Sequence, residues 1–339
     1  DSRVKHISQT AFITTPFLLD VTKQLEELLK DLETQLKKGP VDSIILISDQ
    51  KGIDIVKFFI YELLNKNKDA SQPALPLIII PTSYTTNTLI DYIGIYSSKE
   101  KNITRYHDIR IRPKMVIIDE RAVSNSSARE KALSVVALIG GFIDVLNHTP
   151  FASYDYFLAL QGLNLCKDYG YKAAHSPHDS DSRHNILFAS HLLSLIRLER
   201  GNGLLETMAD TLQKVSKVHY PLLMNILLPY ILEIEIKGNK ETFNHLATSL
   251  GVSSIVEFIH SMMMNLLEPI HPLEVNRLYD IIDEQTSIHV ITLEHIKVAS
   301  KLTFGHVDIS IHPSIITEDD IIRYFEAAFW GYSLPKEWI

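Results

Sequence analysis

The sequence predicts an α/β domain with a partial, parallel, Rossmann-like sheet, followed by an all-helical domain. Short apolar runs such as SIILIS and LIII alternate with helical patterns up to about residue 120. Such runs are typical of strands that are buried on both faces of a parallel sheet. From about residue 124 onward, apolar residues recur at three- and four-residue spacing, which indicates packed helices. We therefore expect two domains, residues 1–123 and residues 124–339.

The elements of the first domain can be assigned in chain order. A helix should run from about residue 16 to residue 38, where Gly39 and Pro40 end it. Of the strands expected on either side of this helix, some are buried in the sheet and two form a hairpin around a polar turn. The expected elements are a strand at 4–7, a strand at 43–48, a helix at 52–67, a strand at 77–80, a hairpin of 90–96 with 108–112, and a strand at 115–119.

The second domain should consist of ten helices. Their apolar residues share a helical period, and polar or turn residues separate them. The last helix should begin after Thr317, because Thr is a good N-cap and three acidic residues follow it in the first turn. The other nine are expected at 128–146, 154–169, 183–200, 203–215, 221–236, 240–250, 254–266, 272–284 and 292–302.

Composition excludes several classes of protein. The net charge is −8, from 33 Lys and Arg against 41 Asp and Glu, so a nucleic-acid groove is not expected. The apolar runs are shorter than a membrane span requires. The single cysteine, Cys166, excludes an internal disulfide. We expect a cytoplasmic protein that binds neither nucleic acid nor membrane.

Several motifs in the right order resemble one known family. Residues 225–229 read NILLP, residues 81–89 read PTSYTTNTL, and strand 44–47 is followed by SDQK. Pro113 precedes Asp119 at the expected distance, and His312-Pro313 stands near the end. This series resembles the iron-containing (group III) alcohol dehydrogenases, relatives of dehydroquinate synthase. The resemblance implies their fold, a Rossmann-like domain followed by a helical domain.

The resemblance also places the metal site of that family. Its four ligand positions correspond to Ala137, Gly141, Glu206 and Tyr220 in this sequence. A methyl group and a hydrogen atom cannot bind a metal, and one carboxylate with one phenol is too few ligands to hold one. Without a Lewis acid nothing polarises an alcohol oxygen for hydride transfer. We therefore expect no metal.

The cofactor-binding turns of the family are also changed. Residues 48–51 correspond to the family's glycine-rich phosphate cradle but carry side chains, and residues 82 and 83 correspond to its second marker. Asp49 places a carboxylate near the phosphate position, and like charges at that distance cost about 4 kcal/mol at an effective dielectric near 20. We expect no cofactor, with NAD(P) bound weakly if at all. The six positions are Ser48, Asp49, Gln50, Lys51, Thr82 and Ser83.

Two functions remain open from the sequence. In the first, the chain has lost metal-dependent oxidoreductase activity and acts as a binding, regulatory or assembly subunit. In the alternative, it is an NAD(P)-dependent oxidoreductase or another enzyme with a rebuilt interdomain site. Glu206, Tyr220 and His219 are then the candidate catalytic residues, and Lys51 is a further group near them. Measuring the metal and the cofactor bound to the purified protein would discriminate between the two functions.

The family also has a strand–helix–strand unit ahead of the first segment matched here. We expect that the chain is a fragment, that its sheet is reduced, or that another chain supplies these strands. A homo- or hetero-oligomer is the expected assembly.

Two histidine-containing segments could each contribute to a metal site other than the family's four-ligand site. A one-residue slip would pair His219 with Glu206 as a residual metal site. The other segment combines histidines and acids in one polar loop, where solvated side chains are the simpler expectation. Its residues are His175, His178, Asp179, Asp181 and His184.

Overall fold

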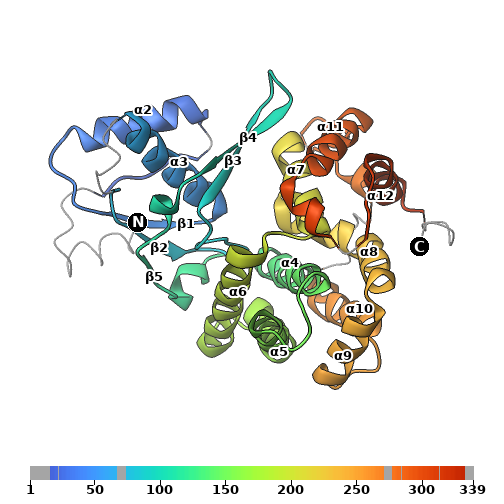
Figure 1. Cartoon of the computed structure of the whole chain (residues 1–339). Helices are drawn as coiled ribbons and strands as arrows, with labels where there is room; N and C mark the ends of the chain where they lie inside the picture. The colour runs from blue at the N-terminus through green and yellow to red at the C-terminus, as the bar shows by residue number, and fades with distance from the viewer. Residues whose placement is uncertain are drawn as a thin grey trace.

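A computed structural model describes residues 16–21, 23–66, 74–270, 277–283, 285–312 and 314–332. It contains a small α/β domain and a larger helical domain, which lie side by side in Figure 1. The predicted fold class is confirmed. The strand expected at 4–7 lies outside the described residues.

The first domain is built on a three-stranded parallel sheet. Its order is β1-β2-β5, from β1 (Ile44–Ser48), β2 (Leu77–Pro81) and β5 (Met115–Val116). The crossover between β1 and β2 runs through α3 (Gln50–Lys66), and α2 (Leu25–Leu36) packs against α3 (Figure 1). The helix predicted from residue 16 begins later, at Leu25. The preceding segment instead makes a turn in which the Lys23 N–H donates to the Asp20 carbonyl at 3.2 Å.

An antiparallel hairpin extends from this domain toward the helical domain (Figure 1). It pairs β3 (Tyr92–Ser97) with β4 (Asn102–His107). The second strand was predicted at 108–112, which is wrong. Asp108 accepts the Arg110 N–H at 2.8 Å, and this cap starts a short 3-10 helix, η1 (Ile109–Ile111), in place of a strand. At the hairpin tip, Lys101 forms a 2.7 Å ion pair with Glu294 of the helical domain.

The helical domain begins after η2 (Glu120–Val123). Most of its helices lie within a few residues of their predicted positions, and Thr317 caps the last one through a reciprocal hydrogen-bonded pair with Asp320. The helices are α4 (Ala128–Asn147), α5 (Tyr154–His175), α6 (Ser180–Arg200), α7 (Leu204–Ser216), α8 (Tyr220–Gly238), α9 (Lys240–Leu250), α10 (Ile255–Leu267), α11 (Leu293–Phe304) and α12 (Glu318–Trp330).

The helix predicted at 272–284 is not formed in its described part. Residues 278–280 form a single 3-10 turn, η4 (Leu278–Asp280). Ile282 then pairs with His289 in an isolated antiparallel bridge, which extends the backbone where a helix was expected. Two other 3-10 turns connect helices in the described part of this domain, η3 (Glu268–Ile270) and η5 (Val307–Ile311).

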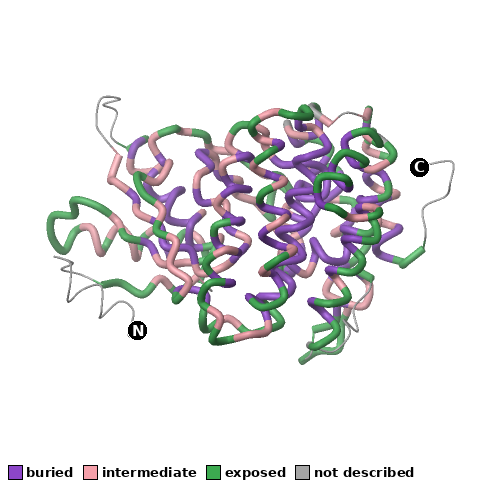
Figure 2. The backbone as a smooth tube through the Cα atoms, turned by 90° about the horizontal axis from the view of Figure 1, so that it is seen from below, coloured by how far each residue is buried: buried purple, intermediate pink, exposed green. Residues whose placement is uncertain are grey.

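Helix α4 forms the centre of the helical domain. It packs against α5, α6, α7, α8 and α10, and every residue from Lys131 to Asn147 is buried. Figure 2 shows the same pattern, with buried backbone inside this domain and exposed backbone on its outer turns. From Lys131 to Asn147, a side chain on α4 is therefore buried whichever way it points. Among the described residues, no single helix is long and apolar enough to cross a membrane, although α9 and α10 together, bent by 57°, pass the test by length and composition.

Candidate functional site

A buried ion pair between Arg197 and Glu206 lies at the centre of the inferred metal position. Arg197 is on α6 and Glu206 is on α7, and their side chains are 6% and 1% exposed. Arg197 Nε donates to Glu206 Oε2 at 2.7 Å, and Arg197 Nη2 pairs with Glu206 Oε1. Two parallel N–H bonds to one carboxylate are the strongest geometry available to this pair of residues. The positive charge at this position is thus supplied by the chain.

The other inferred metal-ligand positions surround this pair. Tyr220 donates its hydroxyl hydrogen to Glu206 Oε1 at 3.2 Å. Gly141, on α4, leaves the space that Arg197 fills, because a Cβ there would lie 2.7 Å from Arg197 Nη2 and 2.9 Å from Glu206 Oε1. Ala137 is buried one helical turn earlier. The structure therefore brings together the positions that the resemblance selected, with a guanidinium beside them.

Asp144 positions Glu206 by capping the start of α7. Its carboxylate accepts the backbone N–H groups of Leu205 at 3.0 Å and of Glu206 at 2.9 Å. Gly203 permits this approach, since a Cβ there would lie 2.7 Å from Asp144 Oδ2. Burial, together with the nearby charge of Glu235, raises the pKa of Asp144 well above its usual value. The first turn of α7 is thereby fixed to α4.

The segment after β2 connects Arg197 to the α/β domain through hydrogen bonds. Asn87 accepts a hydrogen bond from Arg197 Nη1 through its Oδ1 atom. Two residues later, the Leu89 N–H donates to Ser194 Oγ at 3.0 Å, from the same helix as Arg197. On the other side, Lys57 Nζ is fully buried and donates to the carbonyls of Thr88 and Ile90, each at 2.8 Å. This segment is held between α3 and α6.

The predicted cofactor turn lies at the start of α3. Asp49 Oδ1 accepts the Gly52 N–H at 3.3 Å, so this carboxylate caps its own helix. Gln50 donates to Asp54 at 2.7 Å and accepts the Asn87 N–H at 2.6 Å. Burial raises the pKa of Asp54 to about 6 despite the nearby lysines. The Gln50 side chain therefore turns toward the protein.

The two predicted cofactor segments lie next to each other. The Thr82 N–H donates to the Ser48 carbonyl at 3.0 Å. Ser83 Oγ lies 3.2 Å from Thr85 Oγ1, within its own loop. Gly52 makes a close approach, because a Cβ there would overlap Ser48 Oγ and lie 2.8 Å from Ser48 Cβ. The hydrogen bond between Thr82 and Ser48 thus places the two segments side by side.

Three lysines, Lys51, Lys214 and Lys217, lie near the start of α3. Lys51 is exposed at the start of α3, and Lys217 lies with its Nζ 5.7 Å from the Tyr96 ring centroid. Burial lowers the pKa of Lys217, and the charges of Lys51 and Lys214 lower it further. Lys214 also pairs with Asp210. The proximity of three ammonium groups makes this region favourable for an anion.

The two metal hypotheses on histidines are not supported. Glu206 bonds to Tyr220 rather than to His219, which sits at the N-cap of α8 with Glu130 and Asp49 as its nearby acids. His175 ends α5 and its Nε2 lies 2.8 Å from the Leu266 carbonyl. Within the described ranges, no group of three or more His, Cys, Asp or Glu side chains is arranged to hold a metal ion.

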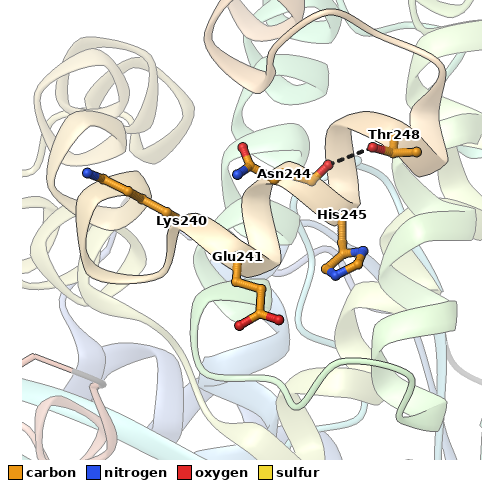
Figure 3. A pocket seen from close by; sticks show the side chains of 5 residues that line it. All are labelled: Lys240, Glu241, Asn244, His245 and Thr248. Atoms are coloured by element: carbon orange, nitrogen blue, oxygen red, sulfur yellow. Dashed lines mark hydrogen bonds between the residues drawn. The ribbon is translucent and has the colours of Figure 1, made fainter.

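A surface hollow of about 470 Å³ lies on α9, a helix that supplies none of the candidate site residues. All of its lining residues come from the exposed side of α9 (Figure 3). The Thr248 hydroxyl donates to the Asn244 carbonyl within the same helix. Because one helix supplies the whole lining, the hollow gathers no convergent groups for chemistry. The lining residues are Lys240, Glu241, Asn244, His245 and Thr248.

Sequence reasoning missed Arg197 and Asn87. Arg197 looked like an ordinary basic residue near the end of a helix. A signal was present, because Arg197 lies four residues after Leu193 and next to Ile196, both on the buried face of α6. A charged residue on an apolar helical face needs a partner, and Glu206 is that partner.

Comparison with known proteins identifies the fold. No family model matches the chain. Among curated proteins, an NAD-dependent methanol dehydrogenase from Bacillus methanolicus is 22% identical over 194 residues, which cover 53% of this chain and 48% of that protein. The chain thus spans about half the length of this relative in the match.

Solved structures extend the likeness to most of the chain. An iron-containing alcohol dehydrogenase from Corynebacterium glutamicum superposes with a TM-score of 0.72 at 20% identity, covering 90% of this chain and 78% of that one. The chain has the fold of the iron-containing alcohol dehydrogenases. An archaeal alcohol dehydrogenase from a Red Sea brine pool superposes with a TM-score of 0.76 at 14% identity, covering 97% of this chain and 87% of that one. A maleylacetate reductase from a Rhizobium strain superposes with a TM-score of 0.70 at 16% identity, covering 91% of this chain and 80% of that one. The resemblance predicted from the sequence is confirmed.

The comparisons correct one prediction about the protein. We expected no cofactor, but the curated relative is NAD-dependent and solved proteins of this fold are iron-containing alcohol dehydrogenases. These comparisons point against the expected absence of a cofactor. The error came from giving too much weight to Asp49, whose carboxylate caps Gly52.

The described residues fit the two cofactors of these relatives differently. Around the first turn of α3, the nearby charges of Lys51 and Lys217 suit a dinucleotide phosphate. At the inferred metal position, Ala137 and Gly141 offer no donor atom, and Arg197 pairs with Glu206. This set of residues does not fit a metal ion of the alcohol dehydrogenase type.

Proposed function

We propose that this protein binds a nicotinamide dinucleotide through the first turn of α3 and has lost iron-dependent hydride transfer. The Arg197–Glu206 pair carries the proposal, since a guanidinium and a glycine occupy the place where metal ligands would converge. A bound dinucleotide would supply hydride chemistry in an active relative. In this chain, Lys51 and Lys217 would neutralise its phosphates.

The proposed role is that of a binding, regulatory or assembly subunit. Two of the groups suggested for a rebuilt active site, Glu206 and Tyr220, are already engaged, which argues against the enzymatic alternative. Both Glu206 oxygens accept hydrogen bonds, and burial raises the pKa of the Tyr220 phenol despite the nearby charge of Arg197. A base that is already saturated and a phenol that ionises less readily are poorly suited to proton transfer at neutral pH.

The assembly proposed is a cytoplasmic homo- or hetero-oligomer. In the described sheet, β1 and β5 are the outer strands. Ile45 within β1 and Ile117, directly after β5, are more than one-third exposed. An outer strand with exposed apolar neighbours can add a further strand from another chain. Sedimentation velocity on the purified chain should show a species larger than a monomer, and a monomer at micromolar concentration would contradict this part.

The test of the proposed function measures binding and turnover separately. Calorimetric titration with NAD⁺ and NADH should show binding, and Lys51→Ala should weaken it severalfold, whereas the matched control Lys240→Ala on α9 should not. Turnover of short alcohols with NAD⁺ should stay at background when Fe²⁺ or Zn²⁺ is added. Metal-stimulated turnover would overturn the proposed loss of hydride transfer, and equal affinity in Lys51→Ala would overturn the binding site.

A further inference from the structure

We propose that Arg197 is a built-in replacement for the metal cation, and that it fixes the helical domain to the α/β domain without any metal. This inference deepens the proposed function and rests on the same inferred metal position. A metal ion would neutralise the carboxylate at position 206, and here the guanidinium does so at 2.7 Å. A buried carboxylate without a cation would be strongly unfavourable.

The replacement depends on Gly141 as much as on Arg197. A Cβ at position 141 would lie 2.7 Å from Arg197 Nη2 and 2.7 Å from Leu193 Cδ2. Real Cβ atoms essentially never show such contacts. The Arg197 side chain on α6 therefore fits only because residue 141 on α4 is glycine.

The same guanidinium reaches the other domain. Its Nη1 donates to Asn87, in the segment that Gln50 and Lys57 tie to α3. Ser194, one helical turn before Arg197, makes the second link to that segment through the Leu89 N–H. A continuous hydrogen-bonded path thus runs from the first turn of α3 to Glu206 on α7.

The spatial claim is tested by a double-mutant cycle on thermal stability. Gly141→Ala alone should lower Tm, because the added methyl group meets Arg197. Arg197→Ala alone should lower Tm by roughly 5 °C or more, since it leaves Glu206 buried without its cation. In the Arg197→Ala background, Gly141→Ala should cost less than half of its original penalty. An equal Tm loss in both backgrounds would overturn the replacement.

Metal independence is tested on the same purified protein. The Tm of the wild-type chain should be unchanged by EDTA and by added Zn²⁺ or Fe²⁺, and elemental analysis should find well under one metal per chain. A rise of several degrees on adding metal, reversed by EDTA, would overturn the inference even if turnover remained absent. The proposed function is tested by turnover and dinucleotide affinity, so its failure can be distinguished from failure of this inference, which is tested by Tm and metal content.

The link between domains is tested by amide hydrogen exchange. Asn87→Ala should speed exchange at the Leu89 amide and its neighbours, because one of the two links to α6 is lost. Thr85→Ala is the matched control, since Thr85 lies in the same segment and pairs with Ser83 within it. Equal exchange in the two variants would show that Arg197 does not join the domains.

Discussion

His312 Nε2 lies 3.2 Å from Glu235 Oε1, and the two side chains are 3% and 2% exposed. The pair connects α8 to the segment before α12, and Asn147 Nδ2 of the central helix lies 3.3 Å from the same nitrogen. Burial lowers the pKa of His312, but the hydrogen bond and charge of Glu235, with a smaller effect of Asp144, raise it overall. The site thus stabilises the charged form of a buried histidine.

This pair predicts a loss of stability on the alkaline side. A group whose pKa is raised by folding contributes all of its stabilisation below its unfolded value, here 6.5, and loses it as pH rises through the folded value. Thermal melts should therefore show Tm falling from about pH 6.5 upward. His312→Gln should flatten that part of the profile, and an unchanged slope in this variant would refute the assignment.

The buried Lys57 side chain leads us to predict a strong effect of its substitution on stability. Lys57→Met keeps most of the apolar stem but leaves the Thr88 and Ile90 carbonyls without their donor. Leaving buried acceptors unpaired costs about 1–3 kcal/mol for each group. Urea denaturation should show a loss of at least about 2 kcal/mol, whereas Lys51→Met, at an exposed position of the same helix, should stay within about 0.5 kcal/mol.

Asp144 predicts a capping effect at α7. Asp144→Ala removes the acceptor of two backbone N–H groups, at Leu205 and Glu206, and should cost about 2–3 kcal/mol by urea denaturation. Asp144→Asn keeps one acceptor oxygen in the same place and should cost clearly less. If both variants lost the same stability, charge rather than capping would be responsible.

Gly52 predicts a steric effect at the dinucleotide turn. Gly52→Ala places a methyl group against Ser48, so the start of α3 must shift away from β1. NAD⁺ affinity should fall at least tenfold in calorimetric titration, because phosphate binding at a helix start depends on the position of its N–H groups. Ser48→Gly combined with Gly52→Ala should recover most of the affinity, and failure to recover would mean that the turn does not bind the ligand.

The sequence predicted elements well where one interaction dominates. The runs that became β1 and β2 are continuous and apolar, and α9 was placed at its observed bounds between Asn239 and Gly251. The prediction failed at β4, whose residues NITRYH are mostly exposed or half-buried and carry little apolar pattern. There the hairpin register with β3 decides the strand, and a register is a long-range property that local spacing does not encode.

The candidate site could be predicted in its positions but not in its chemistry. The family resemblance selected Gly141, Glu206 and Tyr220, and the fold brings them together. It said nothing of Arg197, because that residue belongs to no motif and comes from a different helix. The Arg197–Glu206 ion pair becomes visible only when the distance between the two side chains is known.

The mutual fit of Gly141 and Arg197 has a consequence for single substitutions. A histidine introduced at position 141 would collide with the guanidinium, and removing the guanidinium first would leave Glu206 as an unbalanced buried charge. Each single substitution would therefore produce a less stable protein. A metal-binding side chain could enter position 141 without loss of stability only together with changes at Arg197 and Glu206.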